Sequence, residues 1–434
     1  MTRKYYSFPV VNPQEFKTQM LNWVSQFNIC CFLDNHQYDL PHHSIECIAG
    51  VGVVDVFEPT TDFIASLSAF TTNTKDWIFG HFNYDCKNYI EELNSNHPDR
   101  IGFPDALLFV PEVVLQLSDD TLVIGVLEDD AEFIFQKIQQ CKLPEISNVP
   151  ITFTPRISHQ DYHEAIQQLR KHIKRGDCYE INFCQEFYTE NASPDFVSVY
   201  KCLQANSPNP FAAFYRVNDK YLACASPERY IKKEGNAIIS QPIKGTSPRN
   251  LLNKDADEAN KAMLQKTKKE RSENVMIVDL VRNDLSKVCE EGTVKVDELM
   301  GVYSFPNVHQ MISTVSGKLL PAVNFAEILK ATFPMGSMTG APKKRVMELI
   351  EKYEKSRRGI FSGTVGYIAP NKDFDFNVVI RSLMFNSSTM YLSYQVGGGI
   401  TYESDPEKEY EECLLKAEAI RKVFQDNKKG HPKR

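Results

Sequence analysis

The segment 241–249 places a single lysine, Lys244, between an apolar run and a glycine. Residues 237–239 predict the end of a buried strand, Pro242 excludes a central ladder position beyond it, and Gly245 permits sharp backbone geometry after the lysine. A lysine withdrawn from water at such a place can act as a nucleophile or bind an anion. A solvated lysine at the start of a turn is the other interpretation, and this segment alone does not separate the two.

Two Glu-x-x-Glu pairs lie in segments with helical patterns, and this spacing puts both carboxylates of a pair on one helix face. The pairs are Glu270 with Glu273 and Glu409 with Glu412. Together they could supply oxygen ligands to Mg²⁺, which proteins hold with one or two carboxylates plus water and an anionic substrate. No histidine stands at metal-ligand spacing beside either pair, which argues against zinc or di-iron chemistry. Solvated helix faces remain the alternative in a chain with 56 acidic residues.

Two glycine-containing segments could bring backbone groups to an anion. Residues 336–343 turn into a predicted helix, and free N–H groups at a helix start attract carboxylate or phosphate. The Gly-x-x-x-x-Gly-Lys-Ser/Thr spacing of a nucleotide loop is missing. Gly397–Gly399 would let a ligand approach the backbone closely. An ordinary connection and a bulge, respectively, are the alternatives.

Arg381 falls in an apolar stretch that predicts a strand, with Val379 and Leu383 on the same face. A buried arginine needs an anion, and a carboxylate that accepts two hydrogen bonds is the natural partner. A substrate carboxylate and a structural salt bridge are equal candidates. Taken together, the groups described so far outline an anion pocket with a metal, a lysine and a carboxyl acid.

The elements that must position these groups are mixed strands and helices. Strands are predicted at 48–57, 106–117, 121–127, 178–187, 211–225, 376–384 and 390–396. Helices are predicted from a Ser158 cap to Gly176, over about 255–285, and from Asp405 onward with a proline at the first position.

The same pattern predicts four regions along the chain. These are an N-terminal subdomain (1–140), a connection with three prolines (141–157), a domain (158–425) and a basic tail (426–434). All the groups of the anion pocket described above fall in 158–425, so we expect this to be the catalytic domain.

Composition narrows the class of protein. A chain of 434 residues with 42% hydrophobic content can bury a large core, and its net charge of −7 without a long basic run argues against nucleic acid as the main partner. We expect no membrane, since no apolar run approaches the roughly 18 to 20 residues of a spanning helix. Eleven cysteines without a Cys-x-x-Cys pair, and an N-terminus without the apolar core of a signal peptide, predict a cytoplasmic protein.

Six motifs in order resemble the chorismate-utilising enzymes, and within them the aminodeoxychorismate synthase branch. The motifs are Ser226–Tyr230, Gln241–Arg249, Glu273–Asp284, Gly336–Lys343, Phe361–Tyr367 and Gln395–Thr401. The resemblance is strong over about 158–425 and looser over the first 140 residues. It implies an α/β (α+β) chain with an anthranilate-synthase-like fold, in which two large antiparallel sheets pack face to face with helices outside.

The resemblance also implies roles for residues of this sequence. Glu273 and Glu412 match Mg²⁺ ligands, and Glu270 and Glu409 match carboxylates around the same metal. The groups that match substrate-binding positions are Arg381, Tyr367, Thr339, Gly340, Gly398, Gly399, Thr246 and Lys416. The residues that match catalytic positions are Lys244, Glu228 and His309, with Glu228 as the acid that protonates the departing C4 hydroxyl of chorismate.

Lys244 discriminates between branches of the family, since anthranilate synthases carry alanine at this position. The implied reaction is attack of the lysine amine on C2 of chorismate as the C4 hydroxyl leaves, then attack of ammonia at C4 to give 4-amino-4-deoxychorismate for p-aminobenzoate and folate synthesis. This chemistry requires the neutral amine. We expect the apolar strand and a nearby Mg²⁺ to lower the lysine pKa.

Departures from the family pattern limit the alternatives. Relatives that add water place a lysine where Glu180 stands, and the aminodeoxychorismate branch usually has glutamine there, so the role of Glu180 is open. The Leu-x-Ser pattern of tryptophan-binding relatives reads 33–35 Leu-Asp-Asn here, which argues against a tryptophan site. No glutaminase motif is visible, so we expect ammonia from a separate glutamine amidotransferase subunit. An anthranilate synthase large subunit and a non-catalytic chorismate-binding relative are the alternatives.

Overall fold

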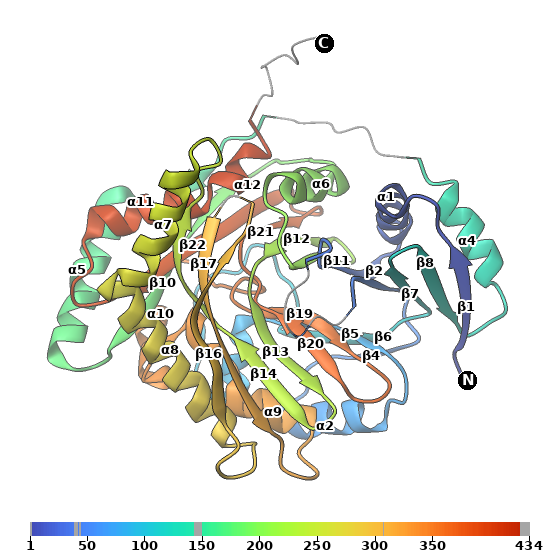
Figure 1. Cartoon of the computed structure of the whole chain (residues 1–434), viewed down its shortest axis with the longest axis horizontal. Helices are drawn as coiled ribbons and strands as arrows, with labels where there is room; N and C mark the ends of the chain where they lie inside the picture. The colour runs from blue at the N-terminus through green and yellow to red at the C-terminus, as the bar shows by residue number, and fades with distance from the viewer. Residues whose placement is uncertain (1, 39–41, 43–44, 143–149, 307, 426–434) are drawn as a thin grey trace.

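The computed structural model describes residues 2–38, 42, 45–142, 150–306 and 308–425, which form two antiparallel sheets and the helices around them (Figure 1). The strand order of the first sheet is β1-β8-β7-β3-β2-β11-β12-β21-β22-β10-β18, with β9 beside β10. The order of the second sheet is β15-β17-β14-β13-β20-β19-β5-β6-β4, with β16 beside β17. The predicted α/β class with two large antiparallel sheets is confirmed.

The first sheet has twelve strands. Their bounds are β1 (Lys4–Pro9), β2 (Ile29–Asp34), β3 (Cys47–Val51), β7 (Val113–Ser118), β8 (Thr121–Val126), β9 (Thr154–Pro155), β10 (Glu180–Thr189), β11 (Phe211–Val217), β12 (Lys220–Ser226), β18 (Gly340–Ala341), β21 (Ser382–Asn386) and β22 (Tyr391–Ile400).

The second sheet has ten strands. Their bounds are β4 (Asp55–Phe57), β5 (Ile78–Phe82), β6 (Ala106–Val110), β13 (Arg229–Glu234), β14 (Ala237–Gln241), β15 (Ile243–Pro248), β16 (Lys295–Ser304), β17 (Val308–Lys318), β19 (Thr364–Ile368) and β20 (Phe374–Asn377).

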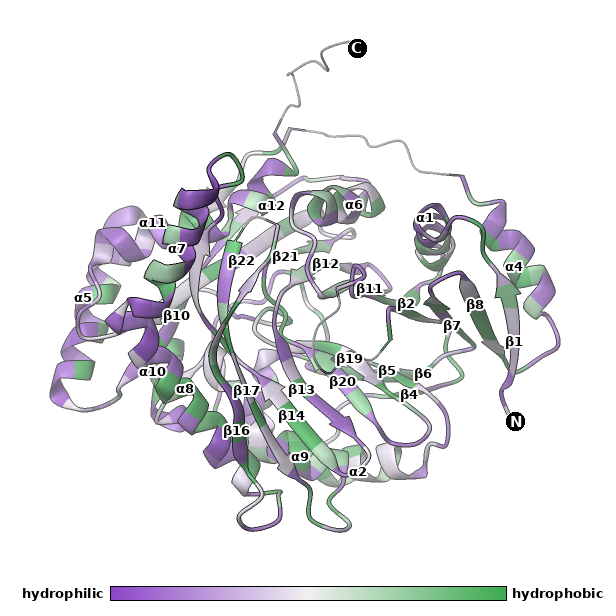
Figure 2. Cartoon of the chain, viewed as in Figure 1, coloured by the Kyte–Doolittle hydropathy of each residue, from purple (hydrophilic) through white to green (hydrophobic). Residues whose placement is uncertain are grey.

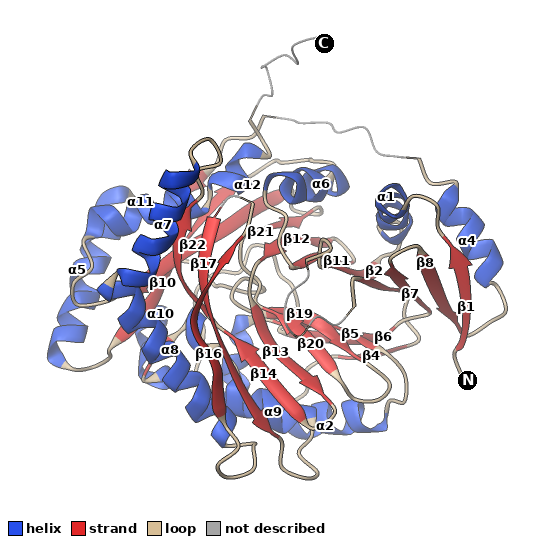
Figure 3. Cartoon of the chain, in the orientation of Figure 1, coloured by secondary structure: helices blue, strands red, loops and turns tan. Residues whose placement is uncertain are grey.

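Helices cover the outside of both sheets, as the blue and red layers of Figure 3 show. Their bounds are α1 (Pro13–Val24), α2 (Phe63–Asn73), α3 (Lys87–Glu91), α4 (Ala131–Gln139), α5 (His159–Arg175), α6 (Phe196–Asn206), α7 (Lys254–Lys266), α8 (Lys268–Ser286), α9 (Phe325–Thr332), α10 (Lys343–Tyr353), α11 (Pro406–Lys416) and α12 (Glu418–Lys422), with short 3₁₀ helices η1 (Tyr84–Cys86) and η2 (Gly336–Met338). None of the helices in the described part of the chain combines the length and apolar composition that a membrane-spanning helix requires.

Side chains of one strand serve two separate cores because successive residues point to opposite faces. On β2, Cys30 and Phe32 belong to the core under α1, α4, α5 and α6, whereas Cys31 between them belongs to the core that the second sheet shares. Hydropathy follows the same layering, with hydrophilic residues concentrated on the outer helices such as α5 (Figure 2). The two sheets therefore pack face to face, and each buries apolar side chains against helices as well.

The N-terminal region and the catalytic region share both sheets. Strand β2 pairs with β11 across the first sheet, and β5 pairs with β19 across the second. The predicted boundary at 141–157 thus joins two segments of common sheets, and its described end forms β9. Part of that connection (143–149) and the predicted tail (426–434) lie outside the described residues.

Several predicted element boundaries are confirmed and others are wrong. Ser158 caps α5 and Gly176 ends it in the left-handed conformation, as predicted. The helix predicted over about 255–285 is two helices that meet at Thr267, whose extended backbone (ψ 118°) interrupts the helical path. Four predicted strands, at 48–57, 106–117, 211–225 and 376–384, are each two strands separated by a turn or bend.

Candidate active site

A cavity of about 1030 Å³ opens where β15, α8, β22 and α11 meet. Its walls include ten of the residues that the sequence analysis selected. They are Glu228, Lys244, Thr246, Glu270, Glu273, Arg381, Gly398, Gly399, Glu412 and Lys416. Segments far apart in the chain thus bring one lysine, one arginine and several carboxylates to a single site.

Lys244 lies on β15 immediately after the break that Pro242 makes between β14 and β15. Its side chain is 10% exposed, and Nζ donates a hydrogen bond of 2.5 Å to Glu180 Oε1 on β10. Gly245 has φ +96°, as predicted for the residue after the lysine. The interpretation as a buried lysine is therefore correct, and the solvated turn is excluded.

Gly399 leaves the space that the lysine and its partner occupy. A Cβ at this position would lie 2.4 Å from Glu180 Oε1 and 2.9 Å from Lys244 Nζ. Such distances are shorter than van der Waals contact, so any side chain here would displace the pair. The glycine run predicted to let a ligand approach the backbone also makes room for the protein's own ion pair.

The pKa of Lys244 lies above its ordinary value, opposite to the lowering expected from the apolar strand. Burial lowers the pKa of this amine, but the Glu180 and Glu273 carboxyl groups raise it by a larger amount. The net effect is a pKa above the ordinary value. The sequence reasoning counted the apolar strand and missed that Glu180 faces the amine. The raised pKa keeps Lys244 protonated near neutral pH, with the Glu180 carboxylate as a proton acceptor in direct contact.

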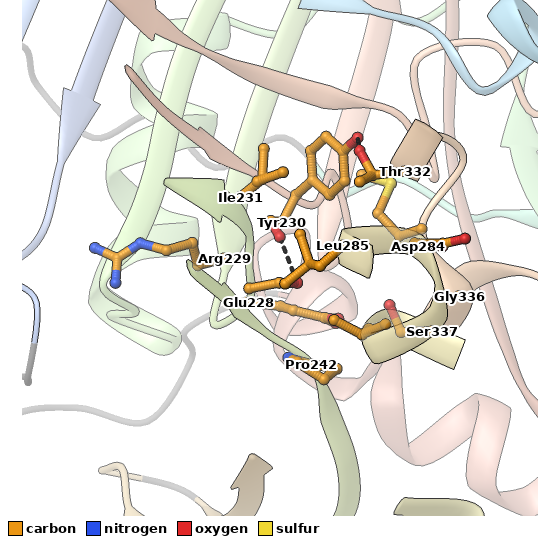
Figure 4. A pocket seen from close by; sticks show the side chains of 13 residues that line it. Glu228, Arg229, Tyr230, Ile231, Pro242, Asp284, Leu285, Thr332, Gly336 and Ser337 are labelled. Carbon is orange, nitrogen blue, oxygen red and sulfur yellow. Dashed lines mark hydrogen bonds between the residues drawn. The ribbon is translucent and has the colours of Figure 1, made fainter. Parts of the chain in front are cut away.

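Glu228 lies between β12 and β13 and lines the cavity from another side. Burial raises the pKa of its carboxyl to about 7, although hydrogen bonds from Ser337 and the Ile243 backbone and the charge of Lys244 oppose the rise. A second, smaller cavity of about 20 Å³ also borders Glu228 (Figure 4). Apolar side chains such as Ile231 and Leu285 belong to the lining of that cavity, and Glu228 itself is only 4% exposed. A carboxyl of this pKa can hold a proton near neutral pH.

The two Glu-x-x-Glu pairs face each other through Lys269, which the sequence analysis missed. Lys269 Nζ lies 2.7 Å from Glu409 Oε1 and 3.8 Å from Glu273 Oε1. Burial raises the pKa of Glu273 to about 8, whereas the Lys416 ammonium holds the pKa of Glu412 down at about 2. Lys269 stands four residues before Glu273, which the sequence shows. Its contact with Glu409 could be inferred only once α8 and α11 are known to be adjacent.

This donor set fits Mg²⁺. Glu273 Oε1 is buried and makes no hydrogen bond within the described chain, so it has an unused lone pair. Glu270 lines the cavity beside it, and burial raises the pKa of the Glu270 carboxyl. Carboxylate oxygens are the ligands that Mg²⁺ prefers. A divalent cation here would relieve the repulsion among these carboxylates and would coordinate the Glu273 oxygen that lacks a hydrogen bond.

Arg381 is at the cavity wall, but not in a strand as predicted. It lies between β20 and β21 with φ +54°, a conformation that strands do not use. Burial lowers the pKa of its guanidinium, and the Glu412 carboxylate raises it. Within the described residues no side-chain hydrogen bond or ion pair engages this guanidinium, so the structural salt bridge is not formed and a substrate anion remains the candidate partner.

Comparison with known proteins shows the family to which this chain belongs. Residues 39–422 match the family described as chorismate binding enzyme. This chain belongs to that family.

Three relatives give the scale of the similarity to this chorismate binding enzyme. An anthranilate synthase component I-like protein of Synechocystis is 35% identical over 353 residues, 79% of this chain and 71% of its own. Aminodeoxychorismate synthase component 1 of Salmonella typhimurium is 33% identical over 344 residues, 79% of this chain and 75% of its own. The crystal structure of anthranilate synthase component I from Streptococcus pneumoniae superposes with a TM-score of 0.75 at 26% identity, and covers 89% of this chain and 94% of its own.

Five residues that the resemblance implied do not line the cavity of this chorismate binding enzyme. Glu409 is one of them, and its carboxylate pairs with Lys269. Tyr367 lines another cavity, of about 60 Å³, together with Asp34. His309 is buried, with ring nitrogens 2.9 Å from Ser304 Oγ and 3.1 Å from Asp257 Oδ1. The Tyr367 and His309 side chains thus lie outside the lining of the cavity that holds Lys244, and their roles toward substrate stay predictions.

Thr339 and Gly340 lie just beyond the wall. The Thr339 hydroxyl donates to the Met335 carbonyl at 3.0 Å, and Gly340 has φ +136°. A Cβ on Gly340 would lie 2.1 Å from the Glu180 carbonyl oxygen, so the glycine permits β18 to pack on β10. These residues support Glu180 and the wall rather than face the cavity.

Residues that the sequence analysis did not select also line the site. Asn182, Ser337 and Phe361 contribute side chains to the cavity wall. Phe361 opens the Phe361–Tyr367 motif, six residues before the tyrosine that was selected. The sequence analysis therefore selected the right motif. Which of its residues faces the cavity depends on the path of the chain into β19, which the sequence alone does not show.

Proposed function

We propose that this chain is the large subunit of an aminodeoxychorismate synthase, which converts chorismate and ammonia to 4-amino-4-deoxychorismate and water. The observation that carries the proposal is the buried Lys244 ammonium, which lines the cavity 2.5 Å from Glu180 Oε1. A relative named aminodeoxychorismate synthase component 1 matches most of the chain. A nucleophilic lysine distinguishes this reaction from anthranilate synthesis, which proceeds in the family with alanine at this position.

Chorismate carries two carboxylates, and the cavity offers separate groups for them. The guanidinium of Arg381, which makes no hydrogen bond or ion pair with a described side chain, can bind one of them with two parallel hydrogen bonds. Lys416, whose Nζ donates to the Gly397 carbonyl at 2.9 Å, adds positive charge at the glycine run. Backbone groups of Gly398 and Gly399 complete this wall. Chorismate held by both carboxylates would present its ring to Lys244 and Glu228.

Glu180, Lys244 and Glu228 supply the protons and the nucleophile of the first step. Glu180 accepts a proton from the Lys244 ammonium, and the neutral amine forms a bond to C2 of chorismate. Both conjugated ring double bonds shift toward C4, the C4–oxygen bond breaks, and the Glu228 carboxyl donates its proton so that water leaves. The step leaves a lysine adduct, a protonated Glu180 and an ionised Glu228.

Ammonia reverses these proton transfers in the second step. Its nitrogen attacks C4, both ring double bonds shift back, and the bond between C2 and Lys244 breaks with its electron pair returning to the amine. Glu228 takes the extra proton of the new C4 ammonium, and Glu180 returns its proton to Lys244. All three groups thus regain their starting states, and the balance is chorismate plus ammonia to aminodeoxychorismate plus water.

Glu273 and Glu412 would hold Mg²⁺ directly, with Glu270 and Glu409 around it. When bound, the cation neutralises a chorismate carboxylate and the carboxylates of the protein. Lys269 would then retain Glu409 as its partner.

Ammonia would come from a separate glutamine amidotransferase subunit, as the name component 1 of the Salmonella typhimurium relative suggests a second component. All eleven cysteines of the chain are free thiols in the structure, which supports a reducing compartment such as the cytoplasm.

A product assay tests the proposal. The chain is incubated with chorismate, Mg²⁺ and an ammonium salt, and the products are separated and identified by mass. We expect 4-amino-4-deoxychorismate as the main product. Anthranilate as the main product would instead support the activity of the anthranilate synthase relatives, and chorismate binding without turnover would indicate a non-catalytic protein.

A further inference from the structure

Two histidines and a glutamate converge outside the cavity, where α5 packs against α11. His159 and His163 are one turn apart on α5, and Glu407 lies in the first turn of α11. One ligand atom of each residue lies within 4.8 Å of the others. Histidines at i and i+4 share a helix face, so α5 presents both imidazoles to the same point. None of the three lines the cavity around Lys244.

The spacing of the ligand atoms matches a coordinated transition metal. Nε2 of His159 and Nε2 of His163 each lie 3.2 Å from the same oxygen, Glu407 Oε2. Ligand atoms about 2.0–2.1 Å from a tetrahedral zinc ion lie about 3.3 Å from one another. Two edges of a coordination tetrahedron are therefore already present in the protein alone.

His163 shows that hydrogen bonding does not account for this arrangement. Its Nε2 is buried and has no hydrogen-bond partner within the described residues, although Glu407 Oε2 is only 3.2 Å away. The nitrogen thus points beside the oxygen rather than at it. This is the orientation required when both atoms point to an ion between them. His159, by contrast, has a hydrogen bond of 3.2 Å with Glu407 Oε1.

Aromatic packing holds the imidazoles in place. The Tyr410 ring lies edge-on to His159 with centroids 4.5 Å apart, and the two histidine rings are 4.3 Å apart. Side chains that are already positioned lose little further rotamer freedom on binding. His159 and Glu407 remain about half exposed, at 50% and 53%, so an ion can enter and keep a water ligand.

We propose that His159, His163 and Glu407 form a binding site for Zn²⁺ or a similar transition-metal ion, separate from the Mg²⁺ site. Two imidazoles and one carboxylate suit zinc, whereas Mg²⁺ prefers oxygen ligands alone. The bound ion cross-links α5 to the start of α11, the helix that also carries Glu412. The proposal does not depend on which product the chain makes.

Calorimetric titration of the full chain with Zn²⁺, in excess Mg²⁺ to fill the carboxylate site, tests the proposal. We expect one Zn²⁺ per chain and binding weakened by about tenfold or more in His163→Ala and Glu407→Gln. Glu164→Gln is the matched control, since it removes a carboxylate from α5 outside the cluster. Titration with Co²⁺ should give the visible absorption of a nitrogen- and oxygen-liganded ion in the wild type and in the control, and lose it in both cluster variants.

Thermal unfolding without added metal shows whether each variant is folded. Zn²⁺ should raise the midpoint of the wild type and of Glu164→Gln but not that of Glu407→Gln, whose exposed side chain can be replaced without disturbing the core. Zn²⁺ binding of equal affinity in all variants, or the absence of stoichiometric Zn²⁺ binding by the wild type, would overturn the proposal.

Discussion

Lys244 is flanked by two buried carboxyl groups that do different work. Glu180 makes the short ion pair that raises the lysine pKa, whereas burial raises the pKa of Glu228 to about 7 and keeps it as a proton donor. Environments that separate the behaviour of two carboxyl groups are a common way to assign base and acid. In this site the assignment follows from contact with the amine.

The raised pKa of the Glu228 carboxyl predicts how kcat/KM changes on the alkaline side of its pH profile. Its pKa is raised, so the proton that the acid must donate is present below pH about 7 and lost above it. We expect kcat/KM to fall as the pH rises through about 7, and Glu228→Gln to lower kcat by about 100-fold or more and remove this limb. Ser337→Ala should move the limb to higher pH, since the Ser337 hydrogen bond favours the ionised form. A limb unchanged in Glu228→Gln would assign it to another group.

Glu180 predicts how the amine loses its proton. In the wild type the proton moves within the Lys244–Glu180 pair, so formation of the lysine adduct should depend little on the lysine pKa. In Glu180→Gln the amine must lose its proton to solvent. Below pH about 7, where Glu228 keeps its proton, the adduct rate should therefore rise with pH by up to about tenfold per unit. Mass spectrometry of the protein after brief mixing with chorismate measures this rate. Identical pH dependence in both proteins would remove the role of Glu180.

At the scale of elements, the sequence predicted where some helices begin but not how the helices are arranged relative to one another. The caps at Ser158 and Asp405 were readable because capping is local. Arg381 was misassigned because the apolar residues around it suggest a strand, whereas the chain turns there with φ +54°. Lys269 was missed since its partner Glu409 comes from a helix 140 residues away. Local signals thus located several helix caps, but they missed breaks within elements and contacts between them.

The carboxylates of α8 and α11 face each other, and this arrangement predicts that Mg²⁺ stabilises the folded protein. A cation that binds the folded carboxylates raises the unfolding midpoint, and at a concentration of 100 times Kd the effect is about 2.7 kcal/mol. We expect Glu273→Gln to abolish most of this Mg²⁺-dependent shift, because it neutralises the buried carboxyl with the unpaired oxygen. Glu258→Gln on α7 serves as the control and should retain the shift. Equal shifts in both variants would place the cation elsewhere.

For the whole molecule, the sequence predicted two sheets through the family resemblance, but not that the N-terminal 140 residues complete both of them. Strand pairing between distant segments leaves no periodic signal in either one. The pairs β2 with β11 and β5 with β19 make the two regions mutually dependent for their backbone hydrogen bonds. The site residues come from the C-terminal region, while the sheets that hold them need both.

Shared sheets predict a single cooperative unfolding transition. Both tryptophans, Trp23 and Trp77, lie in the N-terminal region, so fluorescence reports on that region while far-ultraviolet circular dichroism reports on the whole chain. We expect the two signals to coincide in a urea titration. A fluorescence midpoint separated from the dichroism midpoint would show that residues 1–140 unfold independently.

The covalent role of Lys244 is the central claim, and trapping its adduct tests it most directly. Chorismate and Mg²⁺ are added without ammonia, and the intact protein and its peptides are weighed by mass spectrometry. The account predicts an adduct of chorismate less one water on the peptide with Lys244, its loss on addition of ammonium, and no adduct in Lys244→Ala. An undiminished adduct in Lys244→Ala, or none in the wild type while aminodeoxychorismate is still made, would contradict it.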